Sequence, residues 1–395
     1  MHIFLISDLD STHTLKWVTA LHRAGVRLTC FGLGEYDAWK YENFVGLTIH
    51  GTLIDRETIT GSGALSKLKY LSALPRLRKL IQEAQPDLVH AHRISSNGFF
   101  AALVGIRVPL VISSWGIDVY EFPNRSRLHR WITKFTLRQA DVLLTTSRAM
   151  ALEQYQYTNK AIYQTPFGID PGVFYPKAVM SPATPRSATQ FLPEADEPQV
   201  QPPVVIGTIK IIEHIYGIDT LIQAFTLVVQ RVQQPVRLLI VGGGNKLDDY
   251  RRLVKQLGIA DYVDFTGRIP FPEIAPYHRE IDIFVALSRW ESFGVAILEA
   301  SASAVPVVVS DADGPREVVE NGITGIIVPK EDPEAAAAAL CKLVQDPEYR
   351  KKLGRAGRQH VLDNYQWSDN VDRMIAIYQS IIDKKPLPVE AIERV

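Results

Sequence analysis

The sequence contains little cysteine and no long apolar run. Its two cysteines, Cys30 and Cys341, lie far apart among 395 residues, which excludes a disulfide framework and a cysteine metal site. No apolar run reaches the roughly 18 residues that a membrane span needs. Residues 1–6 are apolar but lack a basic region, so they predict a strand and not a signal peptide. We therefore expect a cytoplasmic protein.

The net charge is zero but unevenly distributed. Basic side chains prevail in residues 1–177 and acidic ones in the remainder, which favours different partners for the two halves. A chain of 395 residues is too long for a single core, so we expect two domains.

Short apolar runs alternate with helical sequence in the first half of the chain. Gly25 ends the first predicted helix, and five runs predict strands: residues 2–7, 26–31, 87–91, 109–113 and 141–146. Continuous apolar runs are typical of parallel strands covered on both faces. Residues 1–177 therefore predict a Rossmann-like α/β domain.

A proline-rich segment, residues 178–203, interrupts this alternation and predicts a flexible loop or linker. Alternation then restarts and predicts a second Rossmann-like domain over 204–366, followed by a C-terminal helix, 367–395, that crosses back to the first domain. Its strands are expected at 204–208, 237–241, 263–265, 281–285, 306–309 and 325–328, with a helix at 219–232. Two such domains facing each other imply a cleft, with ligands at the carboxyl ends of the strands.

Residues 288–300 carry two glutamates around a strand-to-helix turn. A helix is expected to start near Phe293 and Gly294, where free N–H groups and the helix dipole favour a phosphate. Glu291 precedes that helix and Glu299 lies inside it, so one carboxylate is expected at a sugar and the other at ribose hydroxyls. The ordinary alternative is two surface glutamates near a helix start.

This segment resembles the glutamate–seven residues–glutamate motif of the retaining glycosyltransferases of family 4, which have the GT-B fold. Residues 267–270, 282–285, 306–311 and 314–325 also resemble that family, strongly over 204–367 and more weakly over 1–177. The resemblance implies that Glu299 binds the ribose and that Glu291 lies beside the sugar and the reacting centre. It further implies a set of donor-binding residues: Ser292, Phe293, Gly294, Val295 and Ala296 at the phosphate, Arg268 and Ile269 at the base, and Gly243 in the glycine run after a strand.

The family also carries two basic residues that neutralise the leaving diphosphate. Lys210 fits the first position, with a solvated loop lysine as the alternative. Ile215 stands at the second position and carries no charge, and the neighbouring His214 is a weak substitute while its imidazole is neutral. With Lys210 and the helix start neutralising charge, no metal is expected, and His90 and His92 lack the cysteine or carboxylate neighbours of a metal site.

Two segments of the first half resemble acceptor-side loops of family members that build surface polysaccharides. In residues 113–123, Asp118 is expected to accept a hydrogen bond from an acceptor hydroxyl, as a catalytic residue, and Trp115, beside Gly116, to stack on a sugar ring. The alternative is that Asp118 caps a turn and Trp115 packs in the core. Residues 11–17 contribute Thr12 and His13.

A basic and apolar surface is expected at residues 65–80 and 125–134. Leucines at helical spacing among lysines and arginines indicate a peripheral contact with an anionic membrane at its inner face, or else core packing under a solvated face. Pro75 indicates two short helices or a kink.

The sequence as a whole predicts a metal-independent hexosyltransferase that needs no cofactor. It would move a sugar from a UDP- or GDP-type nucleotide-sugar co-substrate to a carbohydrate or lipid-linked acceptor in polysaccharide biosynthesis, and the family resemblance implies that the transfer retains the anomeric configuration. No nucleic-acid partner is expected. The alternatives are a nucleotide- or glycan-binding pseudo-glycosyltransferase, a nucleotide-sugar epimerase, and a glycan phosphorylase with a pyridoxal lysine.

Overall fold

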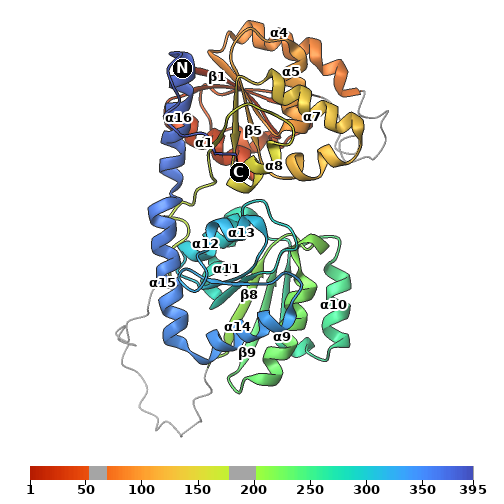
Figure 1. Ribbon diagram of the computed structural model, residues 1–395, viewed down its shortest axis with the longest axis vertical. Helices are drawn as coiled ribbons and strands as arrows, with labels where there is room; N and C mark the ends of the chain where they lie inside the picture. Colours follow the sequence, from red (N-terminus) through yellow and green to blue (C-terminus); the bar gives the residue numbers. More distant parts are fainter. Residues whose placement is uncertain (53–68, 178–201, 395) are drawn as a thin grey trace. The chain divides into compact units, whose positions relative to one another are not determined.

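The protein consists of two compact α/β units (Figure 1). The computed structural model describes residues 1–52, 69–177 and 202–394. Unit 1 comprises Met1–Gly168 and Trp367–Val395, and unit 2 comprises Ile169–Gln366. The predicted loop 178–203 lies outside the described residues except for its last two positions, as do residues 65–68 of the basic stretch.

Unit 1 is built on a seven-stranded parallel sheet in the order β3-β2-β1-β4-β5-β6-β7. The five predicted strands are present, and two short strands, β3 and β7, were not foreseen. The strands are β1 (His2–Ile6), β2 (Arg27–Gly32), β3 (Thr48–Gly51), β4 (Leu88–His92), β5 (Leu110–Ser114), β6 (Val142–Thr145) and β7 (Ile162–Gln164). The strand order reverses between β1 and β4, where a Rossmann-like sheet places its ligand crevice.

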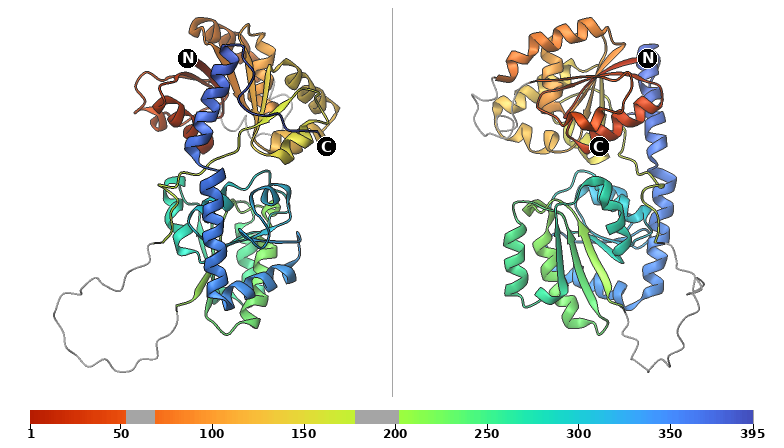
Figure 2. Two further views of the ribbon diagram at one scale, coloured as in Figure 1. Left: turned by 60° about the vertical axis from the view of Figure 1, so that its left-hand side comes forward. Right: turned by 180° about the vertical axis from the view of Figure 1, so that it is seen from behind.

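Helices cover both faces of this sheet (Figure 2). On one face lie α1 (Thr12–Arg23) and α16 (Trp367–Ile382), and α1 buries Trp17, Val18 and Leu21 at helical spacing. On the other face lie α4 (Leu74–Ala84), α5 (Phe99–Val104), α7 (Arg127–Gln139) and α8 (Arg148–Gln154). Five short helical turns complete the described part of the unit before α8: η1 (Ala38–Tyr41), η2 (Lys69–Ala73), η3 (Ile94–Gly98), α6 (Ile117–Tyr120) and η4 (Phe122–Asn124).

Pro75 stands in the first turn of α4, directly after the separate turn η2 (Lys69–Ala73). The expected pair of short helices is therefore present. Leu77 is fully buried and Leu74 half-buried, and both pack into the core, whereas Leu71 of the same leucine stripe is exposed.

Unit 2 is built on a six-stranded parallel sheet in the order β10-β9-β8-β11-β12-β13. All six predicted strands are present. They are β8 (Val204–Ile209), β9 (Val236–Val241), β10 (Val263–Gly267), β11 (Ile283–Ala286), β12 (Val307–Ser310) and β13 (Ile326–Val328). Here the strand order reverses between β8 and β11, which again marks the expected ligand crevice.

The helices of unit 2 pack on its sheet in two layers (Figure 1). The buried face of α9 (Ile218–Arg231), which includes Leu221, Ile222 and Phe225, packs with α14 (Pro333–Gln345) over β8 and β9. The remaining helices are α10 (Leu247–Gln256), α11 (Ile274–Glu280), α12 (Val295–Ala302), α13 (Asp313–Val318) and α15 (Pro347–Asn364), with the short turns η5 (His214–Tyr216), η6 (Ala260–Tyr262) and η7 (Phe271–Glu273).

Residues 169–177 pack with unit 2. The Ile169 N–H donates to the Tyr365 carbonyl over 2.7 Å, and Phe174 packs edge-on against His278. The C-terminal residues pack with unit 1, where Tyr378 of α16 contacts His90 of β4. Among the described residues, no helix combines the length and hydropathy needed to cross a membrane.

Candidate functional site

The unit 2 residues singled out in the sequence gather at the carboxyl ends of its strands. Lys210 follows β8, Gly243 follows β9, and Arg268 follows β10. The segment that begins with Glu291 follows β11. Because carboxyl ends of parallel strands meet at one sheet edge, these residues share the edge at which α/β proteins bind ligands.

Lys210 and Glu291 form an ion pair at the point where the strand order reverses. The Lys210 ammonium donates to the Glu291 carboxylate, and the two side chains are 20% and 12% exposed. The Tyr216 ring lies 4.4 Å below the ammonium. Burial acts to lower the pKa of Lys210, but Glu291 and Tyr216 outweigh it and raise that pKa. Lys210 is therefore a charged donor with three N–H groups. Those that do not bind Glu291 can donate to a second anion.

Arg289 ties the loop after β8 to the turn after β11. Its guanidinium binds both oxygens of Asp219 at 2.9 and 2.8 Å, donates to the His214 carbonyl at 2.7 Å, and pairs with Glu331 at 2.8 Å. The hydrogen bonds to Asp219 raise the pKa of Arg289, and Arg289 holds the pKa of Asp219 below its usual value against the effect of burial. Sequence reading missed this residue, whose main partner is 70 positions away.

Ile215, which stands where the family resemblance implies a lysine, contributes its backbone to the same connection. Its carbonyl accepts from the Arg289 N–H at 2.9 Å and from the Trp290 N–H at 3.4 Å, while its side chain is half-buried. His214 is exposed. The loop is thus fixed through its main chain. Among the described ion pairs, Lys210 is the one cation of this loop that contacts Glu291.

The turn between Glu291 and Glu299 has a backbone that requires glycine. Gly294 caps α12 with φ +102°, a conformation that L side chains rarely adopt, and helix α12 begins at Val295, as the sequence predicts within two residues. Gly314 donates its N–H to the Glu291 carbonyl at 3.0 Å, and a Cβ on Gly314 would lie 2.4 Å from the Phe293 nitrogen. The turn is therefore held in contact with the start of α13.

The first N–H groups of α12 lie at half-exposed positions, Val295 and Ala296. The N–H groups of the next two residues close on the Gly294 carbonyl, so Val295 and Ala296 are the helix-start donors that remain. Ser292 beside them is also half-exposed, whereas Phe293 is buried. This arrangement suits an anionic group, because the donors and the helix dipole act in the same direction.

Glu299 projects from α12 into the interior and is 6% exposed. Its Oε2 lies 3.3 Å from Nε2 of His278 on α11. No local pattern marks His278 as a site residue, since a single histidine in a helix usually belongs to the core.

Gly243 and Arg268 meet at the ends of β9 and β10. A Cβ on Gly243 would lie 3.1 Å from Arg268 Cβ, and the neighbouring Gly242 N–H donates to the Gly267 carbonyl at 3.1 Å. Arg268 is exposed and Ile269 half-exposed. These residues form one corner of the edge, beside the loop that carries Lys210, and their contact with a base stays a prediction.

In unit 1, Asp118 holds together two loops at the sheet edge. Its Oδ2 accepts from the Ile94 N–H at 2.8 Å, and its Oδ1 accepts from Trp115 and Gly116 at 3.2 and 2.9 Å. The carboxylate is 3% exposed, and burial raises its pKa against the opposing effect of these donors and Arg93. The structure therefore gives Asp118 the capping role that was the alternative at the sequence level, and an additional catalytic role stays a prediction.

Trp115 belongs to an aromatic cluster at the same edge. Its ring centroid lies 4.2 Å from His92 and 5.8 Å from Phe167, and His13 stacks on Phe167 at 4.3 Å. Trp115 and His13 are half-exposed, and Thr12 at the start of α1 is exposed. The acceptor-side residues predicted from separate segments thus come together where β1, β4 and β5 end.

The two histidines of β4 differ in their surroundings. His90 is fully buried, with Nδ1 at 2.5 Å from the Tyr378 hydroxyl and Nε2 at 2.8 Å from Ser113 Oγ, and burial lowers its pKa to about 3. His92 bonds Ser7 Oγ at 2.8 Å through Nδ1, and burial likewise lowers its pKa well below the usual value. His90 is therefore a core residue, whereas His92 supports the Trp115 ring.

Metal ligands are not assembled in the parts of the chain that the structure describes, where no group of three or more histidine, cysteine, aspartate or glutamate side chains meets. Motif reading passed over two aspartate–any residue–aspartate pairs, at residues 8–10 and 311–313. In these pairs Asp10 binds Lys40 at 3.0 Å, and Asp311 accepts from the Lys330 N–H at 2.9 Å. Metal independence stays a prediction.

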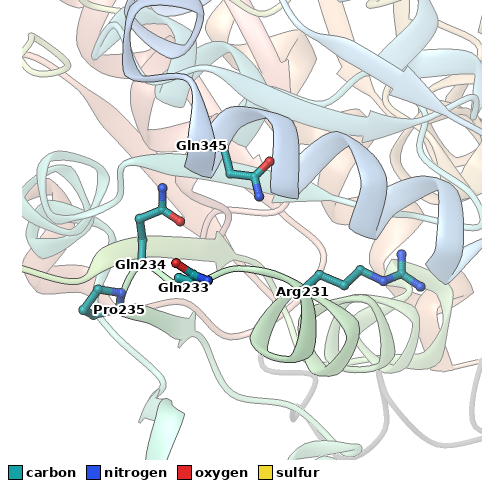
Figure 3. A pocket seen from close by; sticks show the side chains of 5 residues that line it. All are labelled: Arg231, Gln233, Gln234, Pro235 and Gln345. Atoms are coloured by element: carbon teal, nitrogen blue, oxygen red, sulfur yellow. The ribbon is translucent and has the colours of Figure 1, made fainter.

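A shallow pocket of unit 2 lies away from this edge (Figure 3). Arg231, Gln233, Gln234, Pro235 and Gln345 line it, and they come from the end of α9, the approach to β9 and the end of α14. It therefore adjoins the amino end of β9, opposite to the edge that carries Lys210 and Glu291.

The two α/β units, each with its parallel sheet, are those of the GT-B fold of glycosyltransferases. Residues 2–147 match the family model described as "Glycosyl transferase 4-like", and residues 194–360 match "Glycosyl transferases group 1". This chain belongs to the family 4 glycosyltransferases.

Its relatives include the GDP-mannose-dependent alpha-(1-6)-phosphatidylinositol monomannoside mannosyltransferase of Mycolicibacterium smegmatis, 37% identical over 172 residues. That match covers 42% of this chain and 44% of the relative, so it spans less than half of the relative's length. The N-acetyl-alpha-D-glucosaminyl L-malate synthase of Bacillus anthracis is 26% identical, with 79% of each chain covered.

Solved structures share the fold over nearly the whole chain. Sucrose-phosphate synthase from Thermosynechococcus elongatus has a TM-score of 0.75 at 19% identity, covering 98% of this chain and 100% of that one. The Anabaena protein HepE, in complex with UDP and glucose, has a TM-score of 0.73 at 18% identity, covering 96% and 99%.

Proposed function

We propose that this protein is a retaining hexosyltransferase that uses a nucleoside diphosphate sugar of the UDP or GDP type. One observation carries the proposal: Lys210 pairs with Glu291 at the switch point of unit 2, beside the start of α12 and its buried Glu299. The site thus offers a cation, helix-start N–H groups and two carboxylates, which are the groups that a diphosphate, a ribose and a sugar require.

In the proposed reaction, the bond between the anomeric carbon and the diphosphate oxygen breaks, and a new bond to an acceptor oxygen forms. The acceptor hydroxyl loses its proton, and the departing diphosphate takes up one proton. Lys210 and the start of α12 stabilise the charge that develops on the diphosphate. Glu291 orients both the Lys210 ammonium and the sugar hydroxyls, and Glu299 binds the ribose. This assignment needs no metal ion.

The acceptor is proposed to be a carbohydrate or a lipid-linked carbohydrate that meets the edge of unit 1. Trp115 and His13 offer half-exposed aromatic rings there, and Asp118 fixes the loops that carry them. The names of the relatives support a broad range of acceptors, since one name includes a phosphatidylinositol monomannoside and another includes malate.

A panel of nucleotide sugars tests the donor class. Thermal unfolding is measured with UDP-, GDP- and ADP-sugars, because a ligand that binds only the folded state raises the melting temperature with its affinity. The proposal expects one nucleotide to stabilise the protein and its sugar to be transferred or hydrolysed. Stabilisation with no donor turnover would instead support a nucleotide-binding pseudo-glycosyltransferase, which the uncharged Ile215 favours.

We also propose that α7 contacts an anionic membrane. Leu128 and Trp131 are 61% and 55% exposed, and Trp131 stacks on Phe135 at 5.4 Å. Exposed basic residues surround them: Arg125, Arg127, Arg130 and Lys134. An exposed apolar stripe with basic flanks is the pattern of a helix that lies in the interface of an anionic bilayer.

Vesicle co-sedimentation at low salt tests this contact. Vesicles containing phosphatidylglycerol should retain the protein, phosphatidylcholine vesicles should not, and Trp131→Ala should weaken retention. Trp39→Ala is the matched control, because Trp39 is an exposed tryptophan of the same unit outside α7. Equal retention of the two variants, or none for the unmodified protein, would contradict the proposal.

A further inference from the structure

His278 provides Glu299 with a fixed partner inside unit 2. The imidazole has no exposed surface, and its Nε2 lies 3.3 Å from Glu299 Oε2. Phe174 and Phe284 pack on the ring with centroids at 5.5 and 5.6 Å. Because its ring is enclosed on these sides, His278 holds its hydrogen-bonding nitrogen at a defined place beside the carboxylate.

The tautomer of His278 follows from its two nitrogens. An ionised carboxylate only accepts hydrogen bonds, so Nε2 carries the hydrogen that faces Glu299. The opposite nitrogen, Nδ1, is buried without a hydrogen-bond partner in the described parts of the chain. Glu299 is therefore the polar partner that the described structure gives to the His278 ring.

We propose that His278 is a positioning residue for nucleotide binding, which acts by holding the Glu299 carboxylate in the orientation that meets the ribose hydroxyls. The inference rests on the proposed function, in which Glu299 binds the ribose. A buried histidine whose other nitrogen lacks a partner is a poor choice for a core position, where an apolar side chain of similar volume leaves nothing unsatisfied. The hydrogen bond to Glu299 explains why a histidine occupies this buried position.

Loss of His278 should affect nucleotide binding and not turnover. The ribose contact is present both in the bound donor and during reaction, so its loss raises KM and leaves kcat nearly unchanged. The effect should also require the ribose. A ligand that has the diphosphate but no ribose is held by Lys210 and the start of α12, and His278 does not influence it.

Calorimetric titration with UDP, GDP and ADP tests the inference, using the nucleotide that binds tightest. His278→Leu should raise its Kd about tenfold, as expected for one hydrogen bond to a charged group. In a Glu299→Ala background the same change should add no further loss, since the two residues act as one unit. Inorganic pyrophosphate should bind His278→Leu and the unmodified protein alike.

A conservative pair keeps the test valid if His278→Leu does not fold. The amide nitrogen of His278→Gln reaches about as far as Nε2 and should retain most of the affinity. His278→Asn is too short to reach Glu299, so it should show the loss. Equal affinities for these two variants would overturn the inference.

His360 offers a matched control in the same unit. Its Nδ1 lies 3.4 Å from Glu320 Oε1, and its Nε2 likewise has no hydrogen-bond partner in the described structure. His360→Leu should bind the nucleotide with an unchanged Kd. Three outcomes would overturn the role of His278 without affecting the proposed function. They are additive losses of affinity in the double variant, an equal loss of affinity for pyrophosphate, and the same loss of affinity in His360→Leu. An unmodified protein that binds none of the three nucleotides would overturn the proposed function as well.

Discussion

Lys210 and Glu291 lie 81 positions apart in the sequence, yet their side chains form an ion pair where β8 and β11 end. This pair joins two motifs that lie far apart in the sequence. It also brings the expected diphosphate-binding cation to the segment that starts α12. The Tyr216 ring and the Arg289 connections fix the loop around it.

Replacing Lys210 should remove the charge that stabilises the departing diphosphate. Lys210→Ala should lower kcat about 100- to 1000-fold, as loss of a transition-state donor does in other enzymes. Steady-state transfer with the preferred donor measures the effect. Lys351→Ala is the control, because Lys351 pairs with Glu348 on the exposed side of α15. Turnover of Lys210→Ala within twofold of the unmodified rate would contradict the assignment.

Ile215→Lys tests whether the diphosphate site lacks a cation. The Ile215 carbonyl already fixes the loop through Arg289, so the new side chain should be tolerated. If a second charge is missing, kcat/KM should rise about tenfold or more, and the gain should shrink at high salt. Ile215→Met, of similar size without charge, should leave kcat/KM unchanged. A gain in both variants would show that charge is not the cause.

Arg289→Ala should destabilise unit 2, because it leaves Asp219 half-buried without its partner. The expected loss in the free energy of unfolding is about 2–3 kcal/mol, measured by urea denaturation. Arg231→Ala is the matched control, since Arg231 forms a similar two-point contact with Glu334 in an exposed position. That variant should lose about 1 kcal/mol or less. Equal losses would contradict the structural role of Arg289.

Much of the fold follows from local sequence. Five strands of unit 1 and six of unit 2 are continuous apolar runs, and such runs in parallel sheets are recognisable without knowledge of their partners. Strand β3 escaped prediction because Thr48, His50 and Gly51 give it no apolar run, and β7 because it has three residues. Both lie at the edges of their sheet, where burial constrains sequence less.

The site was less accessible to sequence reasoning. Glu291, Gly294 and Lys210 could be predicted as site residues because their spacing resembles a known motif and because each follows a strand. Arg289 and His278 were missed because their roles depend on partners far along the chain, and no local pattern marks such contacts. The catalytic role of Asp118 stays a prediction, and only the structure reveals that both of its oxygens accept backbone N–H groups.

The buried histidines of β4 predict an acid-sensitive unit 1. The pKa of His90 is lowered to about 3, so the folded state stays neutral while the unfolded state takes up a proton below its ordinary pKa near 6.5. The contribution of neutral His90 to the free energy of unfolding is therefore fully present above pH ~6.5, and it is lost as the pH decreases toward 3. At pH ~5 the loss should be about 2 kcal/mol for His90, with His92 adding in the same direction.

Denaturant unfolding at neutral and acidic pH checks this expectation. His90→Gln, which cannot take up a proton, should show a smaller difference between the two pH values than the unmodified protein. An undiminished difference in His90→Gln would assign the acid sensitivity to other groups.

The central claim is that the carboxyl edge of unit 2 binds a nucleoside diphosphate sugar and that the protein transfers its sugar. The most direct measurement is donor turnover by the purified protein, compared with Glu299→Ala, over UDP-, GDP- and ADP-sugars. We predict that one donor is turned over and that Glu299→Ala lowers kcat/KM for it by about 100-fold or more, the loss expected when a site's buried polar groups lose their ligand contacts. Equal turnover by both proteins, or none with any donor, would contradict the account.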